Sequence, residues 1–321
     1  MNWLRTHSYA APVLAALVIF LILNALASPA FLDPDNWNGL LVGAAPFIII
    51  AMAQTPAILS GDGGIDMSVG PLAGVVNALV TVTLMSRGWS DPISIIGCSL
   101  AVGVVSGLIN GVLIAVVRVQ PIIATLGTYL VYQGLAVEIL PMAGGTAPEW
   151  LRDLAGTYAG VPGMVFLFAL IAAAWLLLER TAFKRNLLAV GGDARAAYSA
   201  GVNVAGVRIL AYVISGVLAA IAGLAFTAAL GSGDPRVGTP YTLTSIASVA
   251  LGGVAMTGGR GGMLGAAAAG ALLFLIQTLC TLAQVSIFYL QIFYGLVLIV
   301  ALALNAGAER ARHRRLAAQV G

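Results

Sequence analysis

The sequence contains very little charge. Asp, Glu, Lys and Arg together make up 8% of its 321 residues, against roughly a quarter in ordinary soluble domains. A soluble fold of this size needs many more charged side chains to cover its surface. The low charge therefore excludes a typical cytosolic enzyme, a disordered chain and a nucleic-acid-binding domain, and we expect no nucleic acid among the partners.

The scarce residue types also exclude several kinds of site. Cys98 and Cys280 both fall inside apolar stretches, where two buried thiols are a simpler interpretation than a disulfide or a metal site. His7 and His313 lie near the termini without a neighbouring cluster of Cys, Asp or Glu. The only lysine, Lys184, is not part of a GxxxxGK[ST] run. We therefore expect this chain to bind no metal, no nucleotide and no other cofactor.

Apolar residues, in contrast, are abundant: 60% of the chain is hydrophobic, and the mean hydropathy is +1.01. A helix needs about 20 residues to cross the hydrocarbon core of a bilayer. The charges leave nine long uncharged runs: 6–32, 36–61, 67–86, 92–117, 119–137, 154–178, 209–233, 237–259 and 261–308. The last run is long enough for two spans with a polar turn near Gln284. The pattern predicts an all-α membrane protein of about ten transmembrane helices in a single domain, 1–321.

The distribution of Lys and Arg predicts the orientation. With a cytoplasmic N-terminus, twelve of the 15 Lys and Arg residues fall on the cytoplasmic side, leaving only Arg87, Arg152 and Arg236 outside. We therefore expect both termini in the cytoplasm, a cytoplasmic loop at 179–208 and a basic cytoplasmic tail at 309–321. The first apolar run lacks a convincing cleavage site, so we interpret it as a retained span.

Two glycine-rich stretches interrupt the helical pattern. Residues 60–70 read SGDGGIDMSVG and residues 252–259 read GGVAMTGG, at the end of a short span rich in Ser, Thr and Gly. Such segments are typical of broken or re-entrant helices, which are tolerated where they are buried in protein or line a cavity. The candidate pathway or helix-break residues are Gly63, Gly64, Asp66, Ser68, Gly252, Gly253 and Thr257.

Residues 63–70 and 252–259 are also identical or similar at six of eight positions. This similarity predicts an internal repeat from gene duplication; a chance match in Gly/Ala-rich sequence is the alternative. The span count places both motifs on the same side, which leaves a parallel and an inverted repeat open. We interpret Asp66 mainly as a cap for the helix that follows near Ser68. A pathway role and a lipid-facing loop are the alternatives for this carboxylate.

The loop 179–208 contains the only sizeable polar segment between spans. Its centre, ARAAYSA at 194–200, is rich in the best helix-forming residue and follows Asp193, a good N-cap. Gly191 and Gly192 precede it and Gly201 follows it, so a short helix bounded by glycines is expected. An ordinary positively charged connection is the alternative.

Four segments in order resemble the permease subunits of the ribose/sugar class of bacterial ABC importers: GGIDMSVG at 63–70, VRVQPIIATLGTYLVYQGLA at 117–136, GGDARAAYSAGVNVAGVRI at 191–209 and LGGVAMTGGRGGMLG at 251–265. Two departures from the family pattern stand out. A Gly-Asp pair precedes the first motif, and Asp193, Ala194 and Arg195 partly replace an acidic stretch.

The resemblance implies a transport subunit and not an enzyme, in the bacterial inner membrane. Its partners would be the lipid bilayer, an ABC ATPase that binds ATP and Mg, a periplasmic sugar-binding protein and a second permease, either a copy or a paralogue. The resemblance also implies a coupling helix that docks on the ATPase through Gly191, Gly192, Asp193, Ala194, Arg195, Ala197 and Gly201. The solute would be a sugar, or alternatively a nucleoside or another small polar solute.

Polar residues inside the predicted spans are uncharged amides: Gln54, Asn77, Asn110, Gln133, Gln277 and Gln291. They suit a passage for neutral polyhydroxylated solutes and equally suit hydrogen bonds between helices. An ion-coupled secondary transporter would favour several carboxylates within the spans. A membrane enzyme would need clustered His, Asp or Ser at one face. Neither pattern is present, so both are less favoured alternatives.

Overall fold

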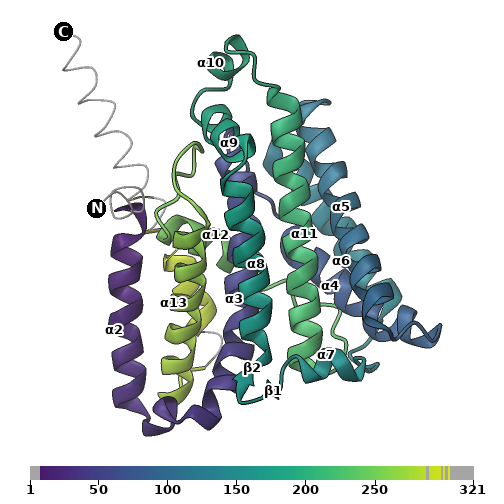
Figure 1. Ribbon diagram of the computed structural model, residues 1–321, viewed down its shortest axis with the longest axis vertical. Helices are drawn as coiled ribbons and strands as arrows, with labels where there is room; N and C mark the ends of the chain where they lie inside the picture. Colours follow the sequence, from purple (N-terminus) through teal and green to yellow (C-terminus); the bar gives the residue numbers. More distant parts are fainter. Residues whose placement is uncertain (1–7, 287–288, 298, 301–302, 304–321) are drawn as a thin grey trace.

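A computed structural model describes residues 8–286, 289–297, 299–300 and 303. These residues form a bundle of roughly aligned helices (Figure 1). The elements are η1 Ser8–Ala10, α2 Ala11–Ala27, η2 Pro29–Leu32, α3 Pro34–Leu59, α4 Val69–Ala78, the π-helix η3 Leu79–Leu84, α5 Pro92–Ala115, α6 Pro121–Ile139, α7 Glu149–Asp153, β1 Thr157–Tyr158, β2 Val161–Pro162, α8 Gly163–Glu179, α9 Ala182–Gly192, α10 Ala194–Ser199, α11 Val204–Leu230, α12 Tyr241–Leu251 and α13 Met263–Leu282.

The two ends of the bundle differ in structure. Helices α9 and α10 lie at one end, and α7 lies with the antiparallel β1–β2 hairpin at the other (Figure 1). We call these the α9–α10 end and the hairpin end. Prolines begin α3, α5 and α6, where the missing N–H costs nothing. Asp33 and Asp91 cap α3 and α5 by accepting backbone N–H bonds of 3.1 and 2.9 Å.

Within the described residues, five helices are long and apolar enough to cross a membrane: α3, α5, α6, α11 and α13. Helices α8 and α9 would add a sixth as one span bent by 75°. Glu179 lies at this bend, where it accepts a 2.8 Å hydrogen bond from the Trp175 indole and pairs with Lys184. The chain also turns at Gln284, whose backbone is left-handed. The polar turn predicted near this residue is therefore present. An all-α membrane fold is therefore confirmed at this coarser level.

Small residues hold the central helices together. Helix α11 packs most extensively against α5 and α3. At the α5 contact a Cβ on Gly107 would lie only 2.3 Å from the carbonyl oxygen of Tyr212. Such close backbone approach is how helices associate where apolar burial gives no drive, because lipid tails are as apolar as leucine. Large apolar side chains point outward instead, among them Leu26, Ile123 and Leu170.

Each half of the bundle contains a long helix, a non-helical segment and a short helix in that order, and the long helices of the two halves run in opposite directions. Helix α3 runs toward the α9–α10 end and is followed by a non-helical segment, 60–68, and the short α4. Helix α11 runs toward the hairpin end and is followed by a non-helical segment, 231–240, and the short α12. The two short helices begin against each other inside the molecule. A Cβ on Gly238 would lie 2.0 Å from the carbonyl oxygen of Gly70.

This arrangement corrects the repeat expected from the two similar motifs. Residues 63–70 and 252–259 do not occupy corresponding places in the two halves, because 231–240 is the counterpart of 60–68. Both motifs lie at the α9–α10 end, where Gly61 and Gly258 are in backbone contact. The similar motifs therefore do not mark corresponding places in a repeat, and α3 followed by α4 runs in the opposite direction to α11 followed by α12.

Candidate functional site

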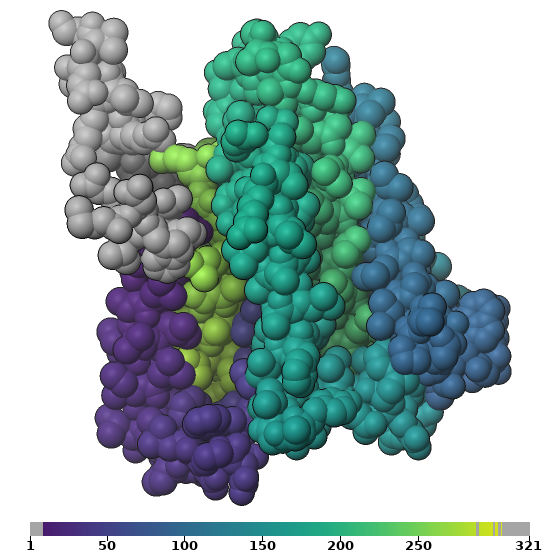
Figure 2. Space-filling view, viewed as in Figure 1, coloured from purple at the N-terminus to yellow at the C-terminus, as the bar shows by residue number. Residues whose placement is uncertain are grey.

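Helices α9 and α10 form a projection at one end of the described part of the chain. The space-filling view shows this segment standing beyond the helices at one end of the molecule (Figure 2). The short helix expected at 194–200 is present as α10, and its cap is confirmed. The Asp193 carboxylate accepts hydrogen bonds from the backbone N–H groups of Arg195 and Ala196 at 2.9 and 3.0 Å. Gly201 ends the segment in a left-handed conformation, with φ +82°.

Two details of this loop differ from the expectation. Gly191 and Gly192 do not form a break before α10, since both are helical and end α9. Asp193 alone separates the two helices. Ala197 does not lie on the outer surface: it is buried among Leu187, Val190 and their neighbours in a small apolar cluster. The outward face of α10 instead carries Arg195 and Tyr198, whose ring is 74% exposed.

Gly191 lies at a junction of three segments that are far apart in the sequence. A Cβ on Gly191 would lie 1.9 Å from the carbonyl oxygen of Leu59 and 2.5 Å from the backbone nitrogen of Gly259. That same N–H of Gly259 donates a hydrogen bond to the Leu59 oxygen at 3.1 Å. A Cβ on Gly258 would lie 2.5 Å from Cα of Gly61. We call Gly61, Gly191, Gly258 and Gly259 the glycine junction.

Three further motif glycines, Gly64, Gly252 and Gly253, also allow close backbone packing. A Cβ on Gly64 would lie 2.1 Å from the carbonyl oxygen of Ala57, and one on Gly252 would lie 2.5 Å from the backbone of Gly265. Gly253 is left-handed, with φ +75°, and abuts the backbone of Tyr9. Gly63 is also left-handed, with φ +67°, but faces open space. Both motifs lie between helices, α3 and α4 for the first and α12 and α13 for the second. Thr257 is exposed at the tip of the second motif.

Asp66 is the centre of a buried hydrogen-bond cluster. Its side chain is 1% exposed. One carboxylate oxygen accepts bonds from the backbone N–H and the hydroxyl of Ser68 at 2.9 and 2.6 Å, and the other accepts from the Ser215 hydroxyl at 3.0 Å. The cluster therefore joins the start of α4 to α11. Asp66 is therefore not the N-cap expected from the sequence: Ser68 holds that position, without a side-chain cap bond, and the Asp66 carboxylate instead fixes the turn that leads into α4.

The cluster extends to three further helices. Asn110 on α5 donates to the Ser68 hydroxyl at 2.9 Å, and Thr128 on α6 donates to the Asn110 amide oxygen at 2.8 Å. Thr125 on α6 donates to the backbone oxygen of Ile65 at 3.1 Å. On α3, the Gln54 amide, in the orientation that satisfies both groups, bonds the backbone N and O of Asp66 at 2.9 and 2.8 Å. Five helices thus meet at one carboxylate without a charged partner.

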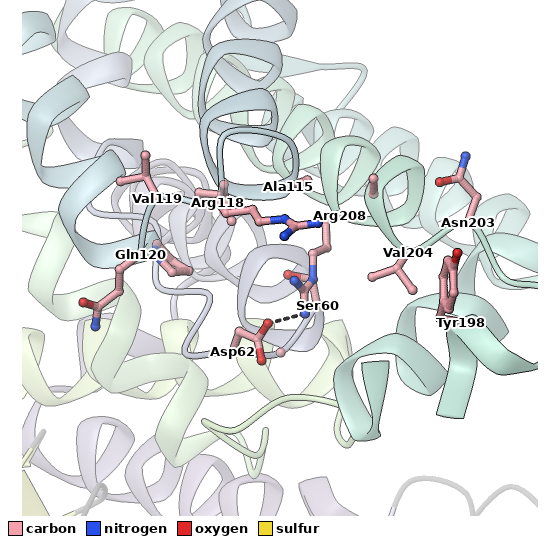
Figure 3. A pocket seen from close by; sticks show the side chains of 14 residues that line it. Ser60, Asp62, Ala115, Arg118, Val119, Gln120, Tyr198, Asn203, Val204 and Arg208 are labelled. Carbon is pink, nitrogen blue, oxygen red and sulfur yellow. Dashed lines mark hydrogen bonds and ion pairs between the residues drawn. The ribbon is translucent and has the colours of Figure 1, made fainter. Parts of the chain in front are cut away.

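A cavity of about 620 Å³ opens at the α9–α10 end of the bundle. Figure 3 shows Arg118 and Arg208 extending into it, with Tyr198 and Asn203 along another edge. The Arg208 guanidinium, whose side chain is 14% exposed, pairs with the Asp62 carboxylate. Arg118 adopts a left-handed backbone conformation, with φ +65°, in the α5–α6 connection. The lining combines charged, amide and apolar groups around the end of the bundle.

Sequence reasoning missed several of these residues. Asp62 is the extra acid that departs from the family pattern, and the structure gives it a partner, Arg208. Both were visible in the sequence only as loop charges. Ser215 and Thr128 carried no signal, because isolated hydroxyls are common in apolar helices. The exposed Tyr198 stood out only as the single aromatic residue of an alanine-rich segment.

No group of three or more His, Cys, Asp or Glu residues within the described part of the chain could hold a metal ion. Cys98 and Cys280 are free thiols in separate helices. The basic tail at 309–321 lies outside the described residues.

A bundle of apolar helices with interrupted spans and a buried, mostly uncharged polar cluster defines a membrane transport protein. Residues 36–302 match the family model described as "Branched-chain amino acid transport system / permease component", and the chain belongs to this family. It is a multi-pass permease of the bacterial inner membrane, a transport subunit and not an enzyme.

Individual relatives cover nearly the whole chain. The ribose import permease protein of Bacillus subtilis (strain 168) is 35% identical over 297 residues, covering 90% of each chain. The autoinducer 2 import system permease protein of Enterobacter sp. (strain 638) is 35% identical over 324 residues, covering 98% of this chain and 92% of its own. The corresponding protein of Escherichia coli (strain K12 / DH10B) is 31% identical over 313 residues, covering 95% and 89%. No solved structure matches the chain.

Proposed function

We propose that the chain is the transmembrane subunit of an ATP-driven importer and carries a sugar delivered by a periplasmic binding protein. The observation that supports a neutral solute is the chemistry of the interior. Buried polar side chains in the described helices are Asn, Gln, Ser and Thr, with Asp66 the one buried carboxylate among the described residues. Amides and hydroxyls match the hydroxyls of a sugar, and fixed charges would add a desolvation cost without a counter-charge on the solute. The ribose permease relative supports the same solute class.

Within the region expected from the sequence, the ATPase would dock on α10, whereas Gly191 and Gly192 at the end of α9 would not contact it. Helix α10 is exposed, is held in place by the Asp193 cap and by the buried Ala197, and presents Arg195 and Tyr198 outward. Aromatic and arginine side chains are the residue types enriched at the centres of protein interfaces. ATP and Mg would belong to the ATPase.

Ten spans with both termini in the cytoplasm remain the proposed topology. The described helices supply nine apolar segments for it: α2, α3, α4 with η3, α5, α6, α8, α11, α12 and α13. The tenth would be the apolar stretch after the turn at Gln284. The α9–α10 end would then be cytoplasmic, in keeping with Arg118, Lys184 and Arg195 at that end. A second permease, identical or paralogous, would complete the passage within the single domain 1–321.

Uptake into proteoliposomes tests the function. The chain is co-reconstituted with the ATPase and the periplasmic binding protein from the same source, and radiolabelled D-ribose is the probe. We expect uptake that requires ATP and all three proteins and that persists when ionophores collapse the ion gradients. Uptake driven by an ion gradient without ATP would support the secondary-transporter alternative. ATP-dependent uptake of a radiolabelled nucleoside, without uptake of D-ribose, would instead support the nucleoside alternative.

The docking surface is tested with an exposed residue. Tyr198→Ala removes most of the outward ring and is expected to weaken co-purification of the ATPase by at least about tenfold, the loss typical of an interface anchor. Leu170→Ala is the matched control, because Leu170 is similarly exposed but lies on the flank of α8. Equal recovery of the ATPase with wild type and Tyr198→Ala would contradict this docking surface.

A further inference from the structure

We propose that the glycine junction transmits movement of α9 and α10 directly to both glycine motifs, and that Gly191 is the positioning residue of this coupling. The inference rests on the proposed docking of an ATPase at α10. The inference adds a structural route by which ATPase docking would affect the interior of the helix bundle. The route begins where Gly191 contacts the backbones of Leu59 and Gly259.

The first step is the rigidity of the contact. The three segments meet through backbone atoms, because Gly61, Gly191 and Gly258 leave no side chain between them. A flexible side chain could absorb a displacement by changing its rotamer, whereas a carbonyl group held in a helix cannot. The hydrogen bond from Gly259 to the Leu59 oxygen joins the two motifs to each other at the same point. Movement of the end of α9 must therefore move both segments or break these contacts.

The second step connects the junction to the interior. Leu59 is the last residue of α3, and the segment that follows leads within seven residues to Asp66. The Asp66 cluster contacts α5, α6 and α11 through Asn110, Thr125 and Ser215. On the other side, the motif at 252–259 joins α12 to α13. A displacement at Gly191 thus has a continuous packed and hydrogen-bonded path to seven helices: α3, α4, α5, α6, α11, α12 and α13.

The chain offers a matched pair of variants for this claim. A Cβ on Gly191 meets the Leu59 carbonyl oxygen at 1.9 Å, so Gly191→Ala must move the helix or α3 by at least about 1 Å to reach an allowed distance. A Cβ on Gly192, the next residue of the same helix, has no atom within 4 Å. Both substitutions change helix propensity equally, and only the first disturbs the junction.

The test is hydrogen–deuterium exchange on the full chain in nanodiscs, with and without the ATPase. In the wild-type chain, ATPase binding should protect 194–199 and should also change exchange at 60–68 and 252–262 by at least about threefold. The loop 143–147 at the hairpin end should stay unchanged. In Gly191→Ala the ATPase should still co-purify and protect 194–199, but the changes at both motifs should disappear, and stimulation of ATP hydrolysis by the binding protein should fall at least about fivefold. Gly192→Ala should behave as wild type.

Protection confined to 182–204 in the wild-type chain would overturn the proposal while leaving ATPase docking intact. The proposal would also be overturned if the binding protein stimulated ATP hydrolysis normally in the complex that contains Gly191→Ala. Absence of protection at 194–199 would refute the docking on which the proposal rests. The wild-type comparison does not require any variant to fold, so a failure of Gly191→Ala to accumulate leaves this test decisive.

Discussion

Replacing Asp66 by alanine should destabilise the protein more than any other single truncation of a polar side chain in the bundle. The carboxylate accepts three hydrogen bonds, two from Ser68 and one from Ser215. At about 0.6 kcal/mol for each interhelical bond in membrane proteins, the direct loss is about 2 kcal/mol. The Ser68 and Ser215 hydroxyls can rotate toward other acceptors, but the buried Ser68 N–H is left without a partner, which costs about 1–3 kcal/mol more. We therefore expect a total loss of about 3–5 kcal/mol.

Conservative variants separate the hydrogen bonds from the charge. Asp66→Asn keeps one oxygen for the two Ser68 donors, and the Ser215 hydroxyl can rotate to accept from the new amide. We expect Asp66→Asn to lose less than half of what Asp66→Ala loses. Ser215→Ala removes one bond and should cost about 1 kcal/mol. Ser99→Ala is the matched control, because the Ser99 hydroxyl is fully buried on α5 and has no hydrogen-bond partner.

The assay is thermal unfolding of purified protein in one detergent, followed by the loss of the monodisperse peak in size-exclusion chromatography. The expected order of melting temperature is wild type and Ser99→Ala highest, then Ser215→Ala, then Asp66→Asn at or below it, and Asp66→Ala lowest. If Asp66→Ala melts with the wild type, the carboxylate does not hold the first helix break in place, and a stabilising role for its bonds to Ser68 and Ser215 is refuted.

Three further perturbations have definite expected outcomes. Asp193→Ala removes the cap of α10 and should cost about 1 kcal/mol locally, seen as faster amide exchange in α10 with an unchanged melting temperature. Gly64→Ala should lower the melting temperature because its Cβ meets a backbone oxygen at 2.1 Å, whereas Gly97→Ala, in open space on α5, should not. Arg208→Gln should lower the stability by at most about 1 kcal/mol, because its ion pair with Asp62 is partly exposed. A double-mutant cycle of Arg208 and Asp62 should give a coupling energy that shrinks in high salt. A coupling energy that does not depend on salt would contradict this account.

Local features of this chain were readable from the sequence because their causes are local. The apolar runs predict the helices, since a span needs only enough consecutive apolar residues. The Asp193 cap of α10 and the left-handed Gly201 follow from the chemistry of neighbouring residues. The helix breaks around 60–68 and 252–262 follow from glycine content. The four ordered motifs also sufficed to identify the permease family.

Contacts between distant segments were decided only by the tertiary structure. The sequence does not reveal that Gly191 is in backbone contact with Leu59 and Gly259, or that Ser215 and Asn110 complete the cluster at Asp66. Each of these contacts joins residues that are far apart in the sequence. A serine or a glycine looks the same in the sequence whether or not the fold gives it such a partner. The similarity of the two glycine motifs shows the limit clearly. Both motifs lie at the α9–α10 end, where Gly61 and Gly258 are in backbone contact, and only the path of the helices shows that α3–α4 and α11–α12 run in opposite directions.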